Sequence, residues 1–185
     1  MLGNESLWEA AKECHAALEQ AAVPHAIIGG VAVCLHGYQR NTVDLDVLIG
    51  SSAQAAVRAA LETAGFQWSE QAAEFRSPGG IPVQLLIAND RAGAGSEVRL
   101  PEPSDSSAVV YLEGLPVLSL ARLIESKIAC GEGNLRRTHK DFADVVELIA
   151  KHDLRQSFAR YLHRSLRKTF RELVLRARGE KRRER

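Results

Sequence analysis

Two aspartates, Asp44 and Asp46, are the residues whose type and spacing first suggest chemistry. They alternate with Val43, Leu45 and Val47, and successive side chains of a strand point to opposite faces. The two carboxylates would therefore share one face, and the three apolar side chains would face a packed layer. Mg²⁺ takes one or two carboxylates together with substrate phosphates. The pair predicts a magnesium site, and the alternative is a solvated strand end near a turn.

A run of apolar residues that ends in Gly29 and Gly30 precedes this pair. Glycine has no Cβ, so the backbone can approach a ligand closely, and a helix that begins there directs free N–H groups at an anion. Together with a carboxylate-bound metal ion, this favours a nucleoside triphosphate as the ligand. A plain tight turn between strand and helix is the alternative, and both interpretations can hold at once.

Arg40 and Thr42 precede the acidic pair at even spacings. Thr42 would share the face of Asp44, where its hydroxyl could bind a phosphate or orient a carboxylate. Arg40 could offset phosphate charge. The alternative is a surface arginine and a threonine that simply favours a strand.

The pattern Gly29-Gly30, thirteen residues, Asp44-x-Asp46 resembles the nucleotidyltransferase superfamily typified by DNA polymerase beta, especially its small prokaryotic members. With Arg40 and Thr42 it is similar to the toxin-type, AbiEii-like nucleotidyltransferases of abortive-infection systems. The resemblance covers about residues 23 to 150. It implies a magnesium-dependent enzyme that transfers a nucleoside monophosphate from an NTP to a hydroxyl of an RNA 3′ end, a protein or a small molecule.

Two later segments are similar to later motifs of that group, one ending in Lys127 and one containing Asp141 and Asp144. The resemblance places Lys127 near the triphosphate or the leaving pyrophosphate, and Asp141 in the active site. Alternatively, Lys127 extends to solvent from an apolar helix face. The helix dipole would favour both aspartates near a helix N-terminus, and this is the preferred interpretation of Asp144.

One position departs from the pattern. Many members of the superfamily carry a third carboxylate on a later strand, and this chain has Gln84 there. A glutamine is a poor proton acceptor and a poorer magnesium ligand. Either Asp141 or Glu74 replaces the missing acid, or the chain is a catalytically impaired nucleotide-binding module, such as one partner of a toxin–antitoxin pair.

Periodicity and turn residues predict an α/β (α+β) fold with a mixed sheet backed by helices. We expect a nucleotidyltransferase core over residues 1–118, a C-terminal helical region over 119–178 packed on it, and a charged tail over 179–185. Capping boxes at Ser6 with Glu9 and at Ser51 with Gln54 predict two helix starts. Helices are expected at 6–22, 31–36, 51–65, 119–131, 138–151 and, continuously, from 153 to about 176, and strands at 25–28, 43–47, 66–69, 73–76, 81–88, 108–112 and 115–118.

The composition is that of an ordinary globular protein, with 45% hydrophobic and 25% charged residues in a chain of 185. The N-terminus has no signal-peptide pattern and no segment is long enough to span a membrane, so we expect a cytoplasmic protein. The three cysteines lack a disulfide or zinc spacing and are expected to be buried. The six histidines show no ligand pattern.

The net charge of +1 conceals an uneven distribution. Residues 155–185 hold 12 Lys and Arg against 3 Asp and Glu, which leaves 12 basic and 20 acidic groups in the first 154 residues. A basic end on an acidic body predicts contact with nucleic acid, with an acidic partner, or with the protein's own body.

Overall fold

The computed structural model describes residues 5–183, which divide into two compact units. The sheet unit contains residues up to 35, residues 39–90 and residues 101–119. The helical unit contains residues 36–38, 91–100 and the chain from 120 onward.

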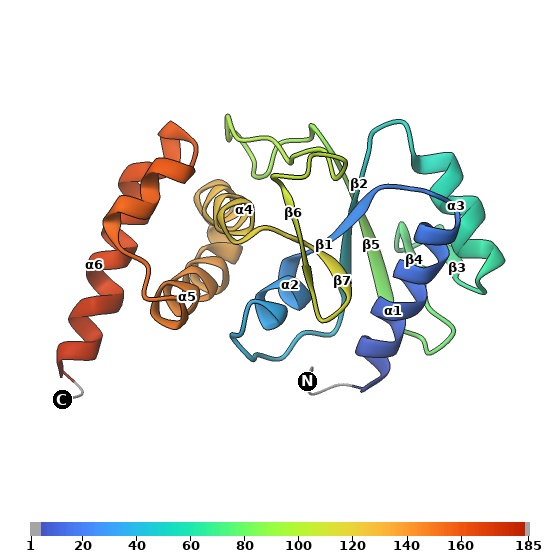
Figure 1. Ribbon diagram of the computed structural model, residues 1–185, viewed down its shortest axis with the longest axis horizontal. Helices are drawn as coiled ribbons and strands as arrows, with labels where there is room; N and C mark the ends of the chain where they lie inside the picture. The colour runs from blue at the N-terminus through green and yellow to red at the C-terminus, as the bar shows by residue number, and fades with distance from the viewer. Residues whose placement is uncertain (1–4, 184–185) are drawn as a thin grey trace. The chain divides into compact units, whose positions relative to one another are not determined.

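A seven-stranded mixed sheet forms the centre of the sheet unit, with strand order β3-β4-β5-β2-β1-β7-β6 (Figure 1). The parallel pairs are β1–β7 and β2–β5, and the remaining neighbours are antiparallel. This confirms the predicted fold class. The elements are α1 (Glu5–Gln20), β1 (His25–Ile28), α2 (Gly29–Leu35), β2 (Leu45–Ile49), α3 (Gln54–Thr63), β3 (Gln67–Ser69), β4 (Glu74–Arg76), β5 (Pro82–Ile87), β6 (Val109–Leu112) and β7 (Leu115–Leu118).

Strand β2 is central and apolar on both faces except at Asp46. Leu45, Val47 and Leu48 are at most 1% exposed, which is typical of a strand with packed layers on both sides. The expectation that Val43 packs with this layer is wrong, because Val43 is 70% exposed. The strand begins only at Leu45, so Val43 and Asp44 lie in the segment that leads into it.

The helical unit contains α4 (Leu120–Gly133) and α5 (Leu135–Lys151), which pack closely together, followed by α6 (Arg167–Arg183) (Figure 1). The single final helix predicted from residue 153 is wrong. Two short 3₁₀ helices, η1 (Gln156–Tyr161) and η2 (Arg164–Leu166), come first, with extended residues between them. Their apolar side chains follow a near-helical spacing, which is why the pattern did not reveal the break.

Three predicted helix boundaries are also wrong. Ser6 lies inside α1, and Ala53 rather than Ser51 is the N-cap of α3, where no side-chain capping bond forms. The helix expected to end at residue 131 continues to Gly133 as α4. Asn134 then caps α5, because its side chain accepts a hydrogen bond from the backbone N–H of Arg136.

The cysteine prediction is confirmed for Cys14 and Cys34, which are buried, whereas Cys130 is half-buried. Burial raises the pKa of Cys14 to about 12, so its thiol stays protonated and unreactive at neutral pH. Among the described helices, none combines the length and apolar character that crossing a membrane requires.

Candidate active site

The corner where β1 passes into α2 lies against Asp46. Strands β1 and β2 are antiparallel with Ile28 opposite Asp46, so the next residue, Gly29, lies beside the carboxylate. A methyl group at Gly29 would lie 1.9 Å from Asp46 Oδ2. Gly29 also has φ of +70°, which L side chains rarely adopt. Glycine is therefore required here both by the backbone conformation and by the close carboxylate.

Gly30 is approached in the same way by Thr42 and Arg40. A methyl group there would lie 2.4 Å from Thr42 Oγ1 and 2.9 Å from Arg40 Nη2. The start of α2 thus has a hydroxyl and a guanidinium directly over it. The structure brings these residues together with Asp46 in one place of the sheet unit.

The segment before β2 is held to α2 by two contacts of Cys34. Its Sγ donates to the carbonyl of Arg40 at 3.4 Å, and its carbonyl accepts from Gln39 Nε2 at 3.3 Å. Thr42 Oγ1 donates a hydrogen bond to Asp44 Oδ1 at 3.1 Å. Of the two roles expected for Thr42, orientation of a carboxylate is therefore the one its contact favours.

The oxygen atoms at this corner suit a hard divalent cation. Asp44 and Asp46 are both half-buried, so their carboxylates are neither fully solvated nor sealed in the core. Among the described residues, no group of three or more metal-ligating acidic, His or Cys side chains is assembled. Two carboxylates are nevertheless what Mg²⁺ takes when substrate phosphates and water provide the other ligands.

Gln84 stands next to Asp46 in the sheet. The two are in register on parallel strands β5 and β2, so their side chains lie on the same face. Phe75 of β4 is in register with Val83, so the preceding residue, Glu74, shares that face on the far side of Gln84. Glu74 is 7% exposed and forms an ion pair with Arg76 at 2.7 Å. A row of Asp46, Gln84 and Glu74 therefore crosses three neighbouring strands.

Lys127 and Asp141 belong to the helical unit, where they contact each other. Lys127 Nζ lies 2.8 Å from Asp141 Oδ1 and 2.8 Å from Asp144 Oδ2. The three residues are between 1% and 5% exposed. The helix-dipole interpretation of Asp144 is wrong, because α5 begins at Leu135 and Asp144 lies beyond its first turn. Extension of Lys127 to solvent is likewise excluded.

The buried cluster of Lys127, Asp141 and Asp144 joins α4 to α5, and its charges nearly cancel when Arg137 is included. One ammonium faces two carboxylates, and the half-exposed Arg137 adds a second cation 3.8 Å from Asp141 Oδ2. Burial of unpaired charges is costly, so each member of the cluster depends on the others. The sequence contained no signal for this network, since Lys127 and Asp144 come from different helices.

No protein-family model and no curated protein matches this sequence. Solved structures match its fold. The antibiotic-resistance factor ANT(2″)-Ia, in complex with adenylyl-2″-tobramycin, is 17% identical, with 87% of this chain and 94% of that chain covered and a TM-score of 0.57. A nucleotidyltransferase-like protein from Paracoccidioides brasiliensis is 20% identical, with 80% and 77% covered and a TM-score of 0.55.

The chain has a nucleotidyltransferase fold. JHP933 from Helicobacter pylori shares it at 19% identity, with 96% of this chain and 92% of that chain covered and a TM-score of 0.53. The likeness extends over both units of this nucleotidyltransferase-fold chain, because nearly its whole length is covered. The toxin-type subgroup and the individual roles of the site residues stay predictions.

We predict that Gly29→Ala destabilises the protein more than Gly80→Ala does. Both glycines have positive φ, so each alanine carries a similar backbone cost of about 1–3 kcal/mol. Gly80 has open space around it, whereas Gly29 faces Asp46. Urea unfolding should show an additional loss of about 1 kcal/mol or more for Gly29→Ala. Equal losses would mean that Asp46 moves aside freely and does not constrain the corner.

We predict that Lys127→Met costs about 3–5 kcal/mol of unfolding free energy, since it leaves two buried carboxylates without their cation. Asp144→Asn keeps the Lys127–Asp141 pair and should cost only about 1–2 kcal/mol. Chemical denaturation of both variants measures the difference. The triple variant Lys127→Met, Asp141→Asn, Asp144→Asn should regain part of the stability, and a loss below about 1 kcal/mol for Lys127→Met would contradict the coupling.

Proposed function

We propose that this protein is a magnesium-dependent nucleotidyltransferase that moves a nucleoside monophosphate from an NTP to a hydroxyl acceptor. The observation that carries the proposal is the contact of Asp46 with the Gly29 corner, beside Thr42 and Arg40. An acidic pair, a backbone without side chains and a guanidinium are the groups that a metal-bound triphosphate needs together. The nucleotidyltransferase fold supports the same conclusion.

In this proposal Asp44 and Asp46 hold the magnesium ion, which when bound would reduce the charge repulsion at the phosphates. Gly29 and Gly30 let the phosphates approach the backbone, and Arg40 offsets their negative charge. The acceptor oxygen forms a bond to the α-phosphorus, the bond from that phosphorus to the pyrophosphate oxygen breaks, and the proton of the acceptor hydroxyl passes to solvent water, because Gln84 cannot accept it. Thr42 keeps Asp44 in place through their hydrogen bond.

The proposed roles of Lys127 and Asp141 differ in kind from those of the corner. Both are buried and paired with each other and with Asp144. We propose that they stabilise the helical unit by fixing α4 to α5, whereas the contact of Lys127 with the phosphates and the place of Asp141 in the active site stay predictions. Direct contact with the nucleotide would require Lys127 to leave a carboxylate partner.

A catalytically impaired nucleotide-binding module, including one partner of a toxin–antitoxin pair, is the second candidate. Gln84 favours it, because an amide stands beside Asp46 where a third carboxylate would help to remove the acceptor's proton. Glu74 is the nearest acid in the same row and is already paired with Arg76.

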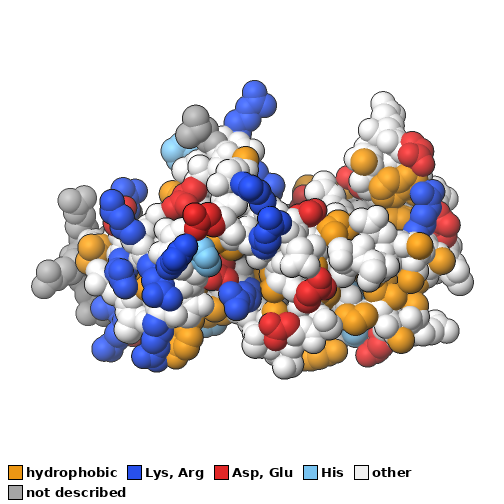
Figure 2. Space-filling model, turned by 90° about the horizontal axis from the view of Figure 1, so that it is seen from above, with side chains coloured by type: hydrophobic (Ala, Val, Ile, Leu, Met, Phe, Trp, Pro, Cys, Tyr) orange, Lys and Arg blue, Asp and Glu red, His pale blue; other side chains and the backbone are white. Residues whose placement is uncertain are grey.

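Among acceptors, RNA is favoured by the basic surface of the helical unit. Lys and Arg side chains gather on the part of the surface formed by the C-terminal helices (Figure 2). Clustered cations of this kind neutralise nucleic-acid phosphates. The exposed ones among the described residues after 154 are Arg155, Arg160, Arg164, Lys168, Arg171, Arg176 and Arg178.

Incubation with each labelled NTP, magnesium and total RNA tests the proposed reaction. We expect transfer to the RNA that stops when magnesium is removed and falls about 100-fold or more in Asp46→Asn, because several kcal/mol of charge stabilisation are lost. Asp90→Asn, an exposed aspartate of the same unit, is the matched control and should retain activity. Magnesium-dependent NTP binding without transfer to RNA, protein or small-molecule hydroxyls would instead support the impaired module.

Gln84→Asp tests whether the missing carboxylate limits the reaction. The side chain is exposed, so the substitution should leave the fold intact. We expect the transfer rate to rise about tenfold or more, because a proton acceptor then stands beside Asp46. Gln67→Asp, at another exposed strand glutamine, is the control and should change nothing. An unchanged rate in Gln84→Asp would show that a different group takes the proton.

A further inference from the structure

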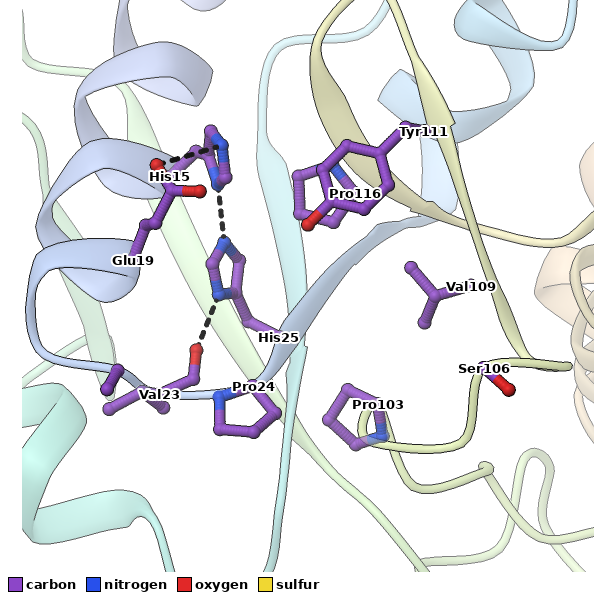
Figure 3. Close-up of a pocket in the computed structure, with 11 residues that line it drawn as sticks. His15, Glu19, Val23, Pro24, His25, Pro103, Ser106, Val109, Tyr111 and Pro116 are labelled. Atoms are coloured by element: carbon purple, nitrogen blue, oxygen red, sulfur yellow. Dashed lines mark hydrogen bonds and ion pairs between the residues drawn. The ribbon is translucent and has the colours of Figure 1, made fainter.

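A cavity of the sheet unit, of about 500 Å³, lies at the beginning of β1 (Figure 3). The candidate active site lies at the other end of that strand, where Gly29 follows Ile28. The cavity walls come from α1, the turn after it, residues 103–106, β6 and β7. Its size is that of small-molecule sites, which are mostly apolar and contain a few converging polar groups.

The polar wall of this cavity is a chain of hydrogen bonds through two histidines. His25 Nδ1 lies 2.8 Å from the carbonyl oxygen of Val23, so this nitrogen carries a proton and donates it. Burial lowers the pKa of His25, and the ring is neutral at pH 7. His25 Nε2 must then accept, and its partner at 2.9 Å is His15 Nδ1. His15 Nδ1 is then the donor of this bond, and the other ring nitrogen, Nε2, is the one that can present a lone pair.

Glu19 places a second acceptor beside that lone pair. Its Oε2 lies 3.8 Å from His15 Nε2, because Glu19 and His15 are one helical turn apart on α1. A nitrogen with two N–H groups can lie about 2.9 Å from both atoms and donate to each. Of the described residues, those that line the cavity include Glu19 but no lysine or arginine, so a cation suits it better than an anion.

The opposite wall is apolar and includes an aromatic ring. In Figure 3, His15, Glu19 and His25 lie on one side of the cavity, and Tyr111 and Pro116 lie on the other. Pro103 and Val109 extend this apolar lining, and Pro24 lies beside His25 (Figure 3). A tyrosine ring attracts a cation toward its face, and proline rings pack well against a flat or aliphatic body.

We propose that this cavity binds a primary ammonium group carried on an apolar body, with the ammonium between His15 and Glu19 and the body against Tyr111 and the prolines. A free organic amine and a lysine side chain share this chemistry. The proposal is independent of the nucleotidyltransferase reaction, since it uses neither the acidic pair nor the glycine corner.

Calorimetric titration of the full-length protein with phenethylamine tests the proposal. We expect binding at least about tenfold tighter than that of 2-phenylethanol or 3-phenylpropionate, which keep the ring but lack the cation. Glu19→Gln should weaken amine binding about fivefold, as expected for a pair with an exposed carboxylate, and Tyr111→Leu by a similar factor. Glu13→Gln and Tyr161→Leu, which are exposed outside the cavity, are the matched controls.

Imidazole NMR signals provide a second test, because the resonance of a histidine with a purely structural role would not shift when the amine binds. Phenethylamine should shift the His15 Nε2 resonance in the wild type and in Glu13→Gln. A lysine-containing peptide that causes the same shift and binds more tightly would identify a lysine side chain as the natural source of the ammonium. Equal affinity for the amine and the alcohol, or unchanged amine affinity in Glu19→Gln, would overturn the proposal. Because Glu19 and Tyr111 are exposed, these variants should fold, which circular dichroism verifies.

Discussion

The close approach of the Asp46 carboxylate to the Gly29 backbone is the constraint on which the candidate site depends. The register that pairs Ile28 with Asp46 requires the chain to turn at once from β1 into α2, and a residue with a Cβ would collide there. The same turn also places Gly30 under Thr42 and Arg40. A single strand pairing therefore determines how a glycine backbone, a carboxylate and a guanidinium come to share one place.

The two groups of aspartates differ in burial and in how their charges are paired. Asp44 and Asp46 stay half-buried, so a cation and water can still reach them. Asp141 and Asp144 are sealed around Lys127, and their charges are satisfied within the protein. A site that exchanges ligands needs the first arrangement, whereas the second contributes rigidity only while it remains complete. This contrast is the physical basis for proposing chemistry at the corner and structural support of α4 and α5 by the cluster.

Features set by neighbouring residues were predictable from the sequence, and features set by distant pairings were not. The end of β1 just before Gly29 and the bounds of β7 follow from local apolar runs and turn residues. The exposure of Val43 does not, because the length of β2 depends on which residues its neighbours offer for pairing. The bond between His15 and His25 was equally hidden, since it joins a helix to a strand across a turn.

The row formed by Asp46, Gln84 and Glu74 bears most directly on the chemistry of this face of the sheet. Backbone likeness to solved structures at 17–20% identity fixes the strands but not these side chains. An amide between two carboxylates can donate a hydrogen bond to either, so it reduces their repulsion without a metal ion. The face therefore carries less negative charge than three carboxylates would, and it needs less positive charge to balance it.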